Sequence, residues 1–166
     1  IAVIAAADFL QQSYRYEQAI TLLESAQSAQ SEQKEIDAAL GSVYYITGQN
    51  ELAAEALGKA VQASKTRVLH ARWIESLALS GQFEEAEKAM DTYQASNATY
   101  SDAMLRSLVS RVKSEQLLAQ GNIEGGKAEL TKYRNALRAA ISVDETNPIP
   151  YIHLCKSLLN EYRLTQ

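Results

Sequence analysis

Apolar residues in this chain recur at the spacing of one helix face. Counting from Tyr16, the residues Ala19, Ile20 and Leu23 stand at i+3, i+4 and i+7, which places all four on one stripe of an α-helix. No stretch alternates apolar and polar residues for long enough to predict a strand. The pattern therefore predicts an all-α fold. The predicted helices are residues 2–13, 16–29, 33–47, 50–63, 66–80, 83–95, 102–120, 122–143 and 150–164.

A six-residue phrase recurs along these helices. It reads GQFEEA at 81–86, GQNELA at 48–53, GNIEGG at 121–126 and, without its glycine, YRYEQA at 14–19. Its last residue falls at Ala19, Ala53, Ala86 and Gly126, with steps of 34, 33 and 40 residues. A repeated period of this size indicates a stack of similar helical units.

The period, the glycine, the aromatic residue two places later and the small residue after it resemble the tetratricopeptide repeat (TPR) family. This resemblance implies a right-handed superhelix of about four helix–turn–helix repeats plus a C-terminal helix. The repeats would be 2–29, 33–63, 66–95 and 102–143, followed by the helix 150–164, in a single domain over 1–166. The last step is seven residues longer than the one before it. Since seven residues make about two helical turns, we expect longer helices in the fourth repeat.

Glycines mark the expected turns between paired helices. Gly48, Gly81 and Gly121 stand where each first helix must stop, and glycine readily takes the left-handed conformation that ends a helix. Asn122 suits the start of the next helix. Gly125 and Gly126 instead lie inside a helical pattern, so we interpret them as a close-packing site or a local kink.

Composition limits the classes of function. The net charge of −4 argues against a general polyanion binder, because phosphate binding needs clustered Lys and Arg, so no nucleic-acid partner is expected. No apolar stretch reaches the ~18 residues of a membrane span. The single cysteine, Cys155, excludes an intrachain disulfide, and we expect its side chain to be buried. The sequence leaves localisation open, with the cytoplasm favoured over the periplasm.

The two ends of the chain allow more than one interpretation. The apolar opening 1–7 is followed by Asp8, and we interpret it as the start of the first helix rather than a signal-peptide remnant. We expect the chain to be a fragment of a longer protein, or the helix 150–164 to cap the stack. A cap requires a polar outer face, which Lys156, Asn160 and Arg163 supply in part.

Catalytic patterns are weak in this sequence. His153 and Cys155 are two residues apart, a spacing that points helical side chains away from each other. No zinc-ligand spacing and no phosphate-binding glycine loop occur. The sequence therefore predicts a protein that is not an enzyme and that holds no metal or cofactor.

In TPR-like domains the first helix of each hairpin lines a concave groove, so this resemblance implies a peptide-binding surface. Arg72–Glu75 and Arg111–Glu115 are also spaced to pair along their own helices, and that simpler interpretation stays open. The candidate groove residues are Asp8, Gln12, Ser42, Tyr45, Arg72, Glu75, Arg111 and Glu115.

Two functions remain at this stage. The first is a non-catalytic scaffold that binds a peptide or partner subunit through the concave groove. The second is a TPR spacer or oligomerisation segment of a larger multidomain protein, for example a transferase, a secretion component or a regulator. The second hypothesis leaves a homo-oligomer open.

Overall fold

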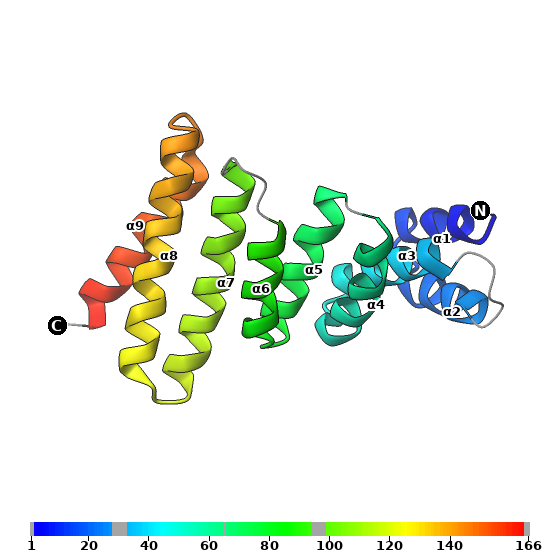
Figure 1. The fold of residues 1–166 in the computed structure, drawn as a ribbon, viewed down its shortest axis with the longest axis horizontal. Helices are drawn as coiled ribbons and strands as arrows, with labels where there is room; N and C mark the ends of the chain where they lie inside the picture. The colour runs from blue at the N-terminus through cyan, green and yellow to red at the C-terminus, as the bar shows by residue number, and fades with distance from the viewer. Residues whose placement is uncertain (1, 28–32, 65, 94–98, 165–166) are drawn as a thin grey trace. The chain divides into compact units, whose positions relative to one another are not determined.

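The computed structural model of this chain describes residues 2–27, 33–64, 66–93 and 99–164. This part of the chain is all-α, 87 % helical and without strands, as the apolar pattern predicts. Its helices are α1 (Ala2–Gln12), α2 (Tyr16–Gln27), α3 (Gln33–Ile46), α4 (Asn50–Ala63), α5 (Arg67–Leu79), α6 (Phe83–Tyr93), α7 (Tyr100–Ala119), α8 (Ile123–Val143) and α9 (Pro148–Leu164) (Figure 1).

The helices fall into two compact units. Unit 1 spans Ile1–Gln82 and holds α1 to α5, and unit 2 spans Phe83–Gln166 and holds α6 to α9. The third predicted hairpin, 66–95, therefore has α5 in unit 1 and α6 in unit 2. The prediction of a single domain over 1–166 stays a prediction.

Unit 1 is a layered stack in which neighbouring helices pack in sequence order. α3 lies at its centre and contacts α1, α2, α4 and α5. The core between them is apolar because each helix turns its stripe inward. The largest fully buried side chains of this core are Leu23, Leu40, Val43 and Leu57.

All four predicted turns have the same hydrogen bonds. At Gly48, the glycine N–H donates to the Tyr45 carbonyl at 3.2 Å, and the next N–H donates to the Tyr44 carbonyl at 2.9 Å. This pair of bonds is the Schellman motif, which requires a left-handed residue. Gly48, Gly81 and Gly121 have φ values of 75°, 82° and 79°, so the predicted role of these glycines is confirmed.

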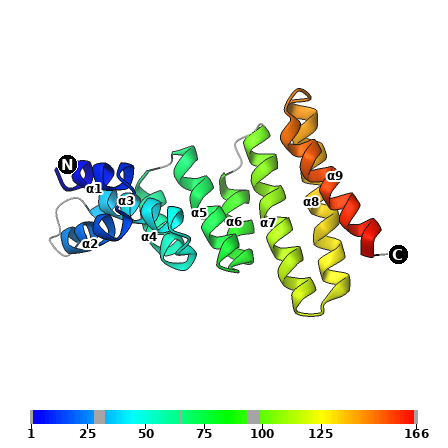
Figure 2. The same cartoon turned by 180° about the vertical axis from the view of Figure 1, so that it is seen from behind.

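Unit 2 contains the longest hairpin. α7 has 20 residues and α8 has 21, against 14 each for α3 and α4, which confirms the expected lengthening. The two helices lie side by side along their lengths (Figure 1). α6 packs against α7, and α9 packs against α8. Figure 2 shows α8 and α9 from the other side of the molecule.

Gly126 is the close-packing site of this hairpin. A methyl group at Gly126 would come within 2.5 Å of the Leu118 side chain on α7. The Ser114 hydroxyl donates to the Gly126 carbonyl at 2.8 Å. The prediction of a close-packing glycine is therefore confirmed, and it explains a residue that costs about 1 kcal/mol of helix propensity relative to alanine.

Side-chain caps fix where the helices of unit 2 begin. α7 begins at Tyr100 because Thr99 and Asp102 form a reciprocal capping box. Asn122 caps α8, as predicted, by accepting a bond from the Gly125 N–H at 3.0 Å. α9 begins at Pro148, two residues earlier than predicted, because proline is well suited to the first helical position and the Asn147 side chain accepts from the Ile149 N–H at 3.1 Å.

One expectation about α9 is wrong, and another holds only in part. Cys155 is exposed rather than buried. Of the residues expected to give α9 a polar outer face, Lys156 and Asn160 are exposed, and the side chain of Arg163 lies outside the described residues. Apolar residues share the exposed surface, since Ile152, Leu158 and Leu159 are 49 %, 44 % and 58 % exposed. The reason is that α9 carries apolar residues on two faces, and α8 covers one of them.

Candidate functional site

A polar cluster joins α3 and α5 in unit 1. The Tyr45 hydroxyl on α3 donates a short hydrogen bond to the Glu75 carboxylate on α5. One helix turn away, the Arg72 guanidinium donates to the Ser42 hydroxyl at 3.1 Å. We call these four residues, Ser42, Tyr45, Arg72 and Glu75, the α3–α5 cluster. The sequence predicted all four as groove residues, and the structure brings them together.

Arg72 has a second contact within this cluster. Its guanidinium carbon lies 5.9 Å from the centroid of the Tyr45 ring, a distance at which a cation is attracted to an aromatic face. Ser42, which accepts from Arg72, donates in turn to the Ala38 carbonyl at 2.8 Å. Arg72 and Glu75 thus each contact α3, whereas their spacing alone also allowed a pair along α5.

The environment of Tyr45 shifts its acidity. Burial, the hydrogen bond to Glu75 and the negative charge of Glu75 raise the pKa of Tyr45 to about 12, against an opposing effect of Arg72. The phenol therefore stays protonated at neutral pH and acts as a donor. The cluster presents a positive charge, a negative charge and an aromatic ring in fixed positions.

Two further predicted residues lie on α1 of the same unit. Asp8 and Gln12 are both exposed. Among the described residues, no hydrogen bond or ion pair joins them to the α3–α5 cluster. Their part in a groove stays a prediction.

The last two predicted residues, Arg111 and Glu115, lie on α7 in unit 2. The Arg111 guanidinium donates to both Glu115 carboxylate oxygens, at 2.8 and 3.1 Å. This is the simpler pairing that their spacing allowed. A single groove that runs from α1 to α7 stays a prediction.

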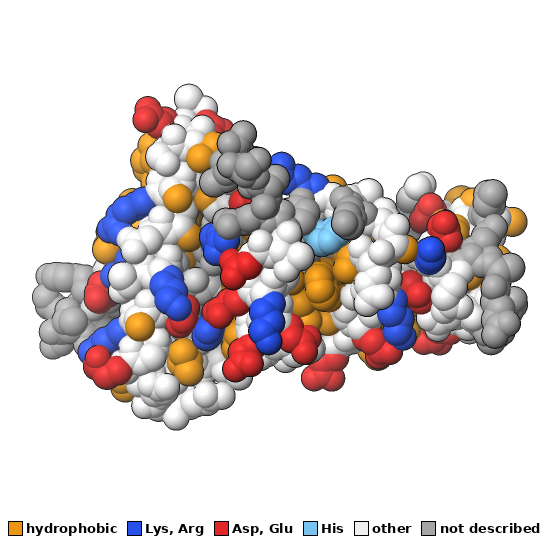
Figure 3. Space-filling view, in the orientation of Figure 1, with side chains coloured by type: hydrophobic (Ala, Val, Ile, Leu, Met, Phe, Trp, Pro, Cys, Tyr) orange, Lys and Arg blue, Asp and Glu red, His pale blue; other side chains and the backbone are white. Residues whose placement is uncertain are grey.

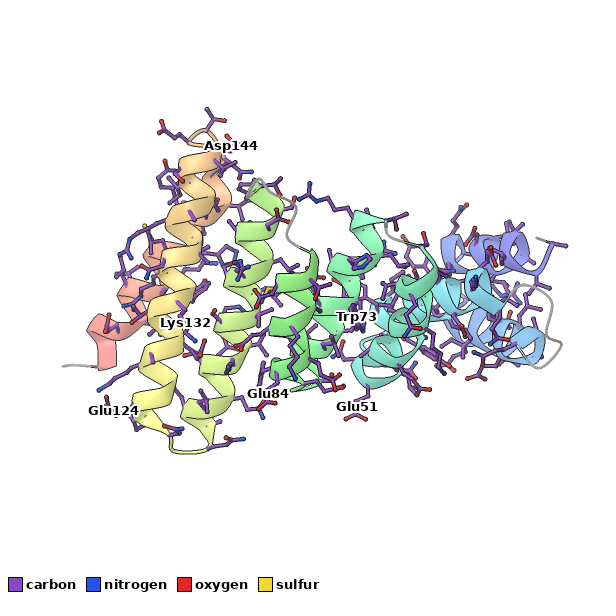
Figure 4. The ribbon with its side chains drawn as sticks, viewed as in Figure 1. Glu51, Trp73, Glu84, Glu124, Lys132 and Asp144 are labelled. Carbon is purple, nitrogen blue, oxygen red and sulfur yellow. The ribbon has the colours of Figure 1, made fainter. Side chains whose placement is uncertain are left out.

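Unit 2 contains an ion network that the sequence interpretation missed. Lys113 on α7 reaches Glu87 on α6 at 2.6 Å and Glu129 on α8 at 3.6 Å. Glu129 is buried and also accepts from Lys132 at 2.8 Å; Figure 4 labels Lys132 midway along α8. These charges hold three helices together.

The acidity of Lys113 reflects this network. Burial alone would lower the pKa of Lys113, but the hydrogen bond with Glu87 and the charges of Glu129 and Glu87 outweigh burial and raise it. The lysine therefore stays charged at neutral pH. Its ammonium nitrogen also lies over the Phe83 ring, 5.9 Å from the ring centroid.

A signal for this network was present in the sequence. Lys113 stands eight residues before its turn glycine, where the second and third copies have Leu40 and Trp73. Glu129 stands eight residues after the same glycine, where those copies have Ala56 and Ala89. Two apolar columns therefore gain opposite charges in the same hairpin.

A cavity of about 390 Å³ lies between α6, α7 and α8 beside this network. Asp91 on α6 and Arg106 on α7 approach within 3.6 Å at its edge, and Met90 and Val109 contribute apolar surface. Figure 3 shows acidic and basic side chains next to each other over α6 and α8. The cavity thus combines apolar lining with charged side chains at its edge.

The described residues offer little for chemistry. They hold no group of three or more His, Cys, Asp or Glu side chains that could bind a metal ion. His153 lies 3.4 Å from the Tyr133 hydroxyl across α8 and α9, while Cys155 faces solvent. Across the same residues, no helix is long and apolar enough to cross a membrane.

Comparison with known proteins does not identify a family. No protein-family model matches the chain, and no curated protein matches it either.

Proposed function

We infer that this chain is a non-catalytic interaction scaffold of the TPR-like type, and that it binds a peptide or partner subunit over the α3–α5 cluster. The single observation that carries this proposal is the fixed arrangement of Arg72, Tyr45 and Glu75 on the surface of unit 1. Cross-helix bonds hold these side chains before any ligand arrives. Binding would therefore lose little side-chain entropy.

The chemistry of the cluster suits a polar peptide. Tyr and Arg are the residue types that most often dominate binding energy at interfaces. Arg72 can pair with a carboxylate of the ligand, and Glu75 can pair with a basic side chain. We propose a ligand with both charges in an extended or helical segment, which would lie along a concave groove of stacked hairpins.

The repeated hairpins support the TPR-like part of this proposal. Each of the four turns has the Schellman bonds at the predicted position, and in unit 1 the first helices α1, α3 and α5 contact one another in order. Contact between successive first helices is what a stack of hairpins with a shared inner face requires.

Peptide selection tests the proposal. Peptides of ~12 residues would be selected from a display library on the immobilised chain, and their dissociation constants measured by fluorescence anisotropy. We expect Arg72→Ala to weaken the selected peptides about tenfold or more, which is about 1.4 kcal/mol.

The matched control is Lys59→Ala on α4. Lys59 also forms an ion pair, with Glu55 at 2.7 Å, but it lies on a second helix away from the cluster. Lys59→Ala should leave the dissociation constants unchanged. Equal affinity in Arg72→Ala and the unmodified chain would refute the proposed site, and loss of affinity in Arg111→Ala would extend it to α7.

A second function has its own supporting observation. The exposed apolar face of α9 favours a spacer or oligomerisation segment of a larger protein. In that case the surface of α9, rather than the α3–α5 cluster, makes the contact.

A further inference from the structure

α9 has an apolar face that no described helix covers. Pro150 and Ser157 are buried on the side that packs against α8, where Arg134 donates to the Ser157 hydroxyl at 2.9 Å and to its carbonyl at 3.0 Å. On its other side α9 exposes a stripe of five residues, which we call the α9 stripe. They are Tyr151, Ile152, Cys155, Leu158 and Leu159.

The width of the α9 stripe is that of a buried helix face. Its residues follow i, i+1, i+4, i+7 and i+8, a pattern that covers about a third of the helix circumference. A single exposed leucine is ordinary, but a continuous apolar stripe indicates a contact surface. The stripe carries no charged residue, so its partner surface must also be apolar.

The packing inside this chain indicates which side chains such a partner needs. In the α3–α4 hairpin, Leu57 lies over Gly41, and in the α7–α8 hairpin, Leu118 lies over Gly126. These two hairpins thus pack a leucine of one helix onto a glycine of the other. The α9 stripe offers two leucines and no glycine, so a helix that covers it must supply the small residues.

α1 has a face with those small residues. Ala2, Ala5 and Ala6 are exposed on the side of α1 that faces away from α2 and α3, together with Phe9, which is 65 % exposed. The side-chain sizes on the α1 face and on the α9 stripe are complementary. Phe9 is the one large side chain among the exposed apolar residues of α1, and Cys155 is the one small side chain in the α9 stripe.

Charge complementarity points to the same pairing. Asp8 is exposed beside the alanine face of α1, and Lys156 is exposed beside the α9 stripe. With Phe9 placed over Cys155 and the two helices parallel, the geometry of 3.6 residues per turn brings Asp8 and Lys156 to the same side of the contact. An antiparallel arrangement would separate them.

We propose that the α9 stripe binds the alanine face of α1 in a second copy of this chain. The contact is heterologous, because it joins different surfaces of the two copies. A heterologous contact joins the copies head to tail, as a ring where the rotation closes and as an open assembly where it does not. The proposal goes beyond the peptide-binding function, since it does not use the α3–α5 cluster.

Sedimentation equilibrium of the chain and of two blocked variants tests this proposal. The mass of the unmodified chain should rise above 18.3 kDa with concentration. Ala5→Glu blocks α1, and Ile152→Glu blocks α9. Both positions are exposed, so each variant should keep its helix content by circular dichroism. Each variant alone should remain at 18.3 kDa.

Mixing the two variants is the decisive measurement. In an equimolar mixture, the free α9 of Ala5→Glu should bind the free α1 of Ile152→Glu, and the mass should double without rising further. A monomeric mass of the unmodified chain up to ~1 mM would overturn the proposal. A dimer formed by Ala5→Glu alone would also overturn it, because that result indicates contact between two copies of α9.

The charge pair gives an independent readout. Asp8→Lys should weaken association about fivefold or more, and Asp8→Lys combined with Lys156→Asp should restore it. Restoration in the double variant requires that the two side chains meet, and failure to restore contradicts the parallel arrangement. Ala5→Glu and Ile152→Glu lie outside the predicted groove residues, so peptide binding should be unchanged in these two variants and the two proposals are tested separately.

Discussion

Tyr14 occupies the turn position in the first hairpin that Gly48 occupies in the second. Its φ is 57°, against 75° for Gly48. The Tyr14 N–H donates to the Gln11 carbonyl at 2.9 Å, and the Arg15 N–H donates to the Leu10 carbonyl at 2.8 Å, as the matching groups do at Gly48. The hairpin therefore imposes the left-handed turn even where the residue opposes it, at a cost of about 1–2 kcal/mol for an L-residue.

Relief of this strain gives the first prediction. Tyr14→Gly should raise the free energy of unfolding of the chain by about 0.5 kcal/mol, since the relieved strain exceeds the added entropy of glycine in the unfolded chain. Urea denaturation followed by circular dichroism measures the change. Gly48→Ala is the reverse control and should lower stability by about 1 kcal/mol, because alanine is strained at a positive φ. Its new methyl group meets nothing within 4 Å, so no steric clash adds to this loss. A loss of stability in Tyr14→Gly would mean that the ring contact of Tyr14 with Tyr16 outweighs the strain.

Gly41 should not tolerate alanine. A methyl group there would lie 2.6 Å from the Leu57 Cγ and 3.0 Å from the Leu57 backbone nitrogen. Leu57 is fully buried and cannot turn away. We expect Gly41→Ala to lower the free energy of unfolding by about 1–2 kcal/mol, because overpacking of about 1–3 kcal/mol outweighs the better helix propensity of alanine.

Gly126→Ala is the matched control for this prediction. Its methyl group would also meet a leucine side chain, Leu118 at 2.5 Å. Leu118 is 38 % exposed and can rotate outward, so the variant should cost less than Gly41→Ala. Similar losses in the two variants would show that burial of the leucine does not decide the outcome.

Helices and turns could be predicted because their signals are local. The recurring phrase placed Gly48 and its equivalents, and it aligned Tyr14 with them although Tyr14 is not a glycine. Contacts between helices were less predictable. The spacing of Arg72 and Glu75 allowed a pair along α5, but both side chains contact α3 instead, since periodicity along one helix does not show what the neighbouring helix presents.

The exposure of Cys155 could not be predicted for a related reason. Apolar residues lie on two faces of α9, and periodicity alone does not show which face a neighbour covers. The side chain of Cys155 lies on the uncovered face. Charges in apolar columns were more informative, because Lys113 and Glu129 depart from the other copies at matching positions.

Stability should fall in alkaline solution as two tyrosines lose their protons. The pKa of Tyr44 is raised to about 12 by burial and by the Glu24 carboxylate that accepts its hydrogen bond, and the pKa of Tyr45 is also raised to about 12. Both contributions are fully present below pH 10.0, the ordinary tyrosine value. They are lost between about pH 10 and pH 12, because the unfolded chain releases these protons first.

Two measurements test the alkaline prediction. Urea denaturation at increasing pH should show the fall above pH 10, and absorbance near 295 nm should show late ionisation of these two groups. Tyr44→Phe and Tyr45→Phe should each remove one late group. Ionisation of every tyrosine near the ordinary value would contradict the prediction.

The pair Lys113–Glu129 should show strong energetic coupling. Lys113→Leu leaves Glu129 buried, with Lys132 as its ion-pair partner among the described residues. We therefore expect the free energy of unfolding to fall by about 1–3 kcal/mol. Adding Glu129→Ala restores the apolar pattern of the second and third copies, so the double variant should recover at least half of that loss. A double-mutant cycle in urea measures the coupling.

The exposed pair Lys59–Glu55, with side chains 53 % and 66 % exposed, is the control and should couple by less than about 0.5 kcal/mol. Additive losses at Lys113 and Glu129 would show that their charges stabilise unit 2 independently.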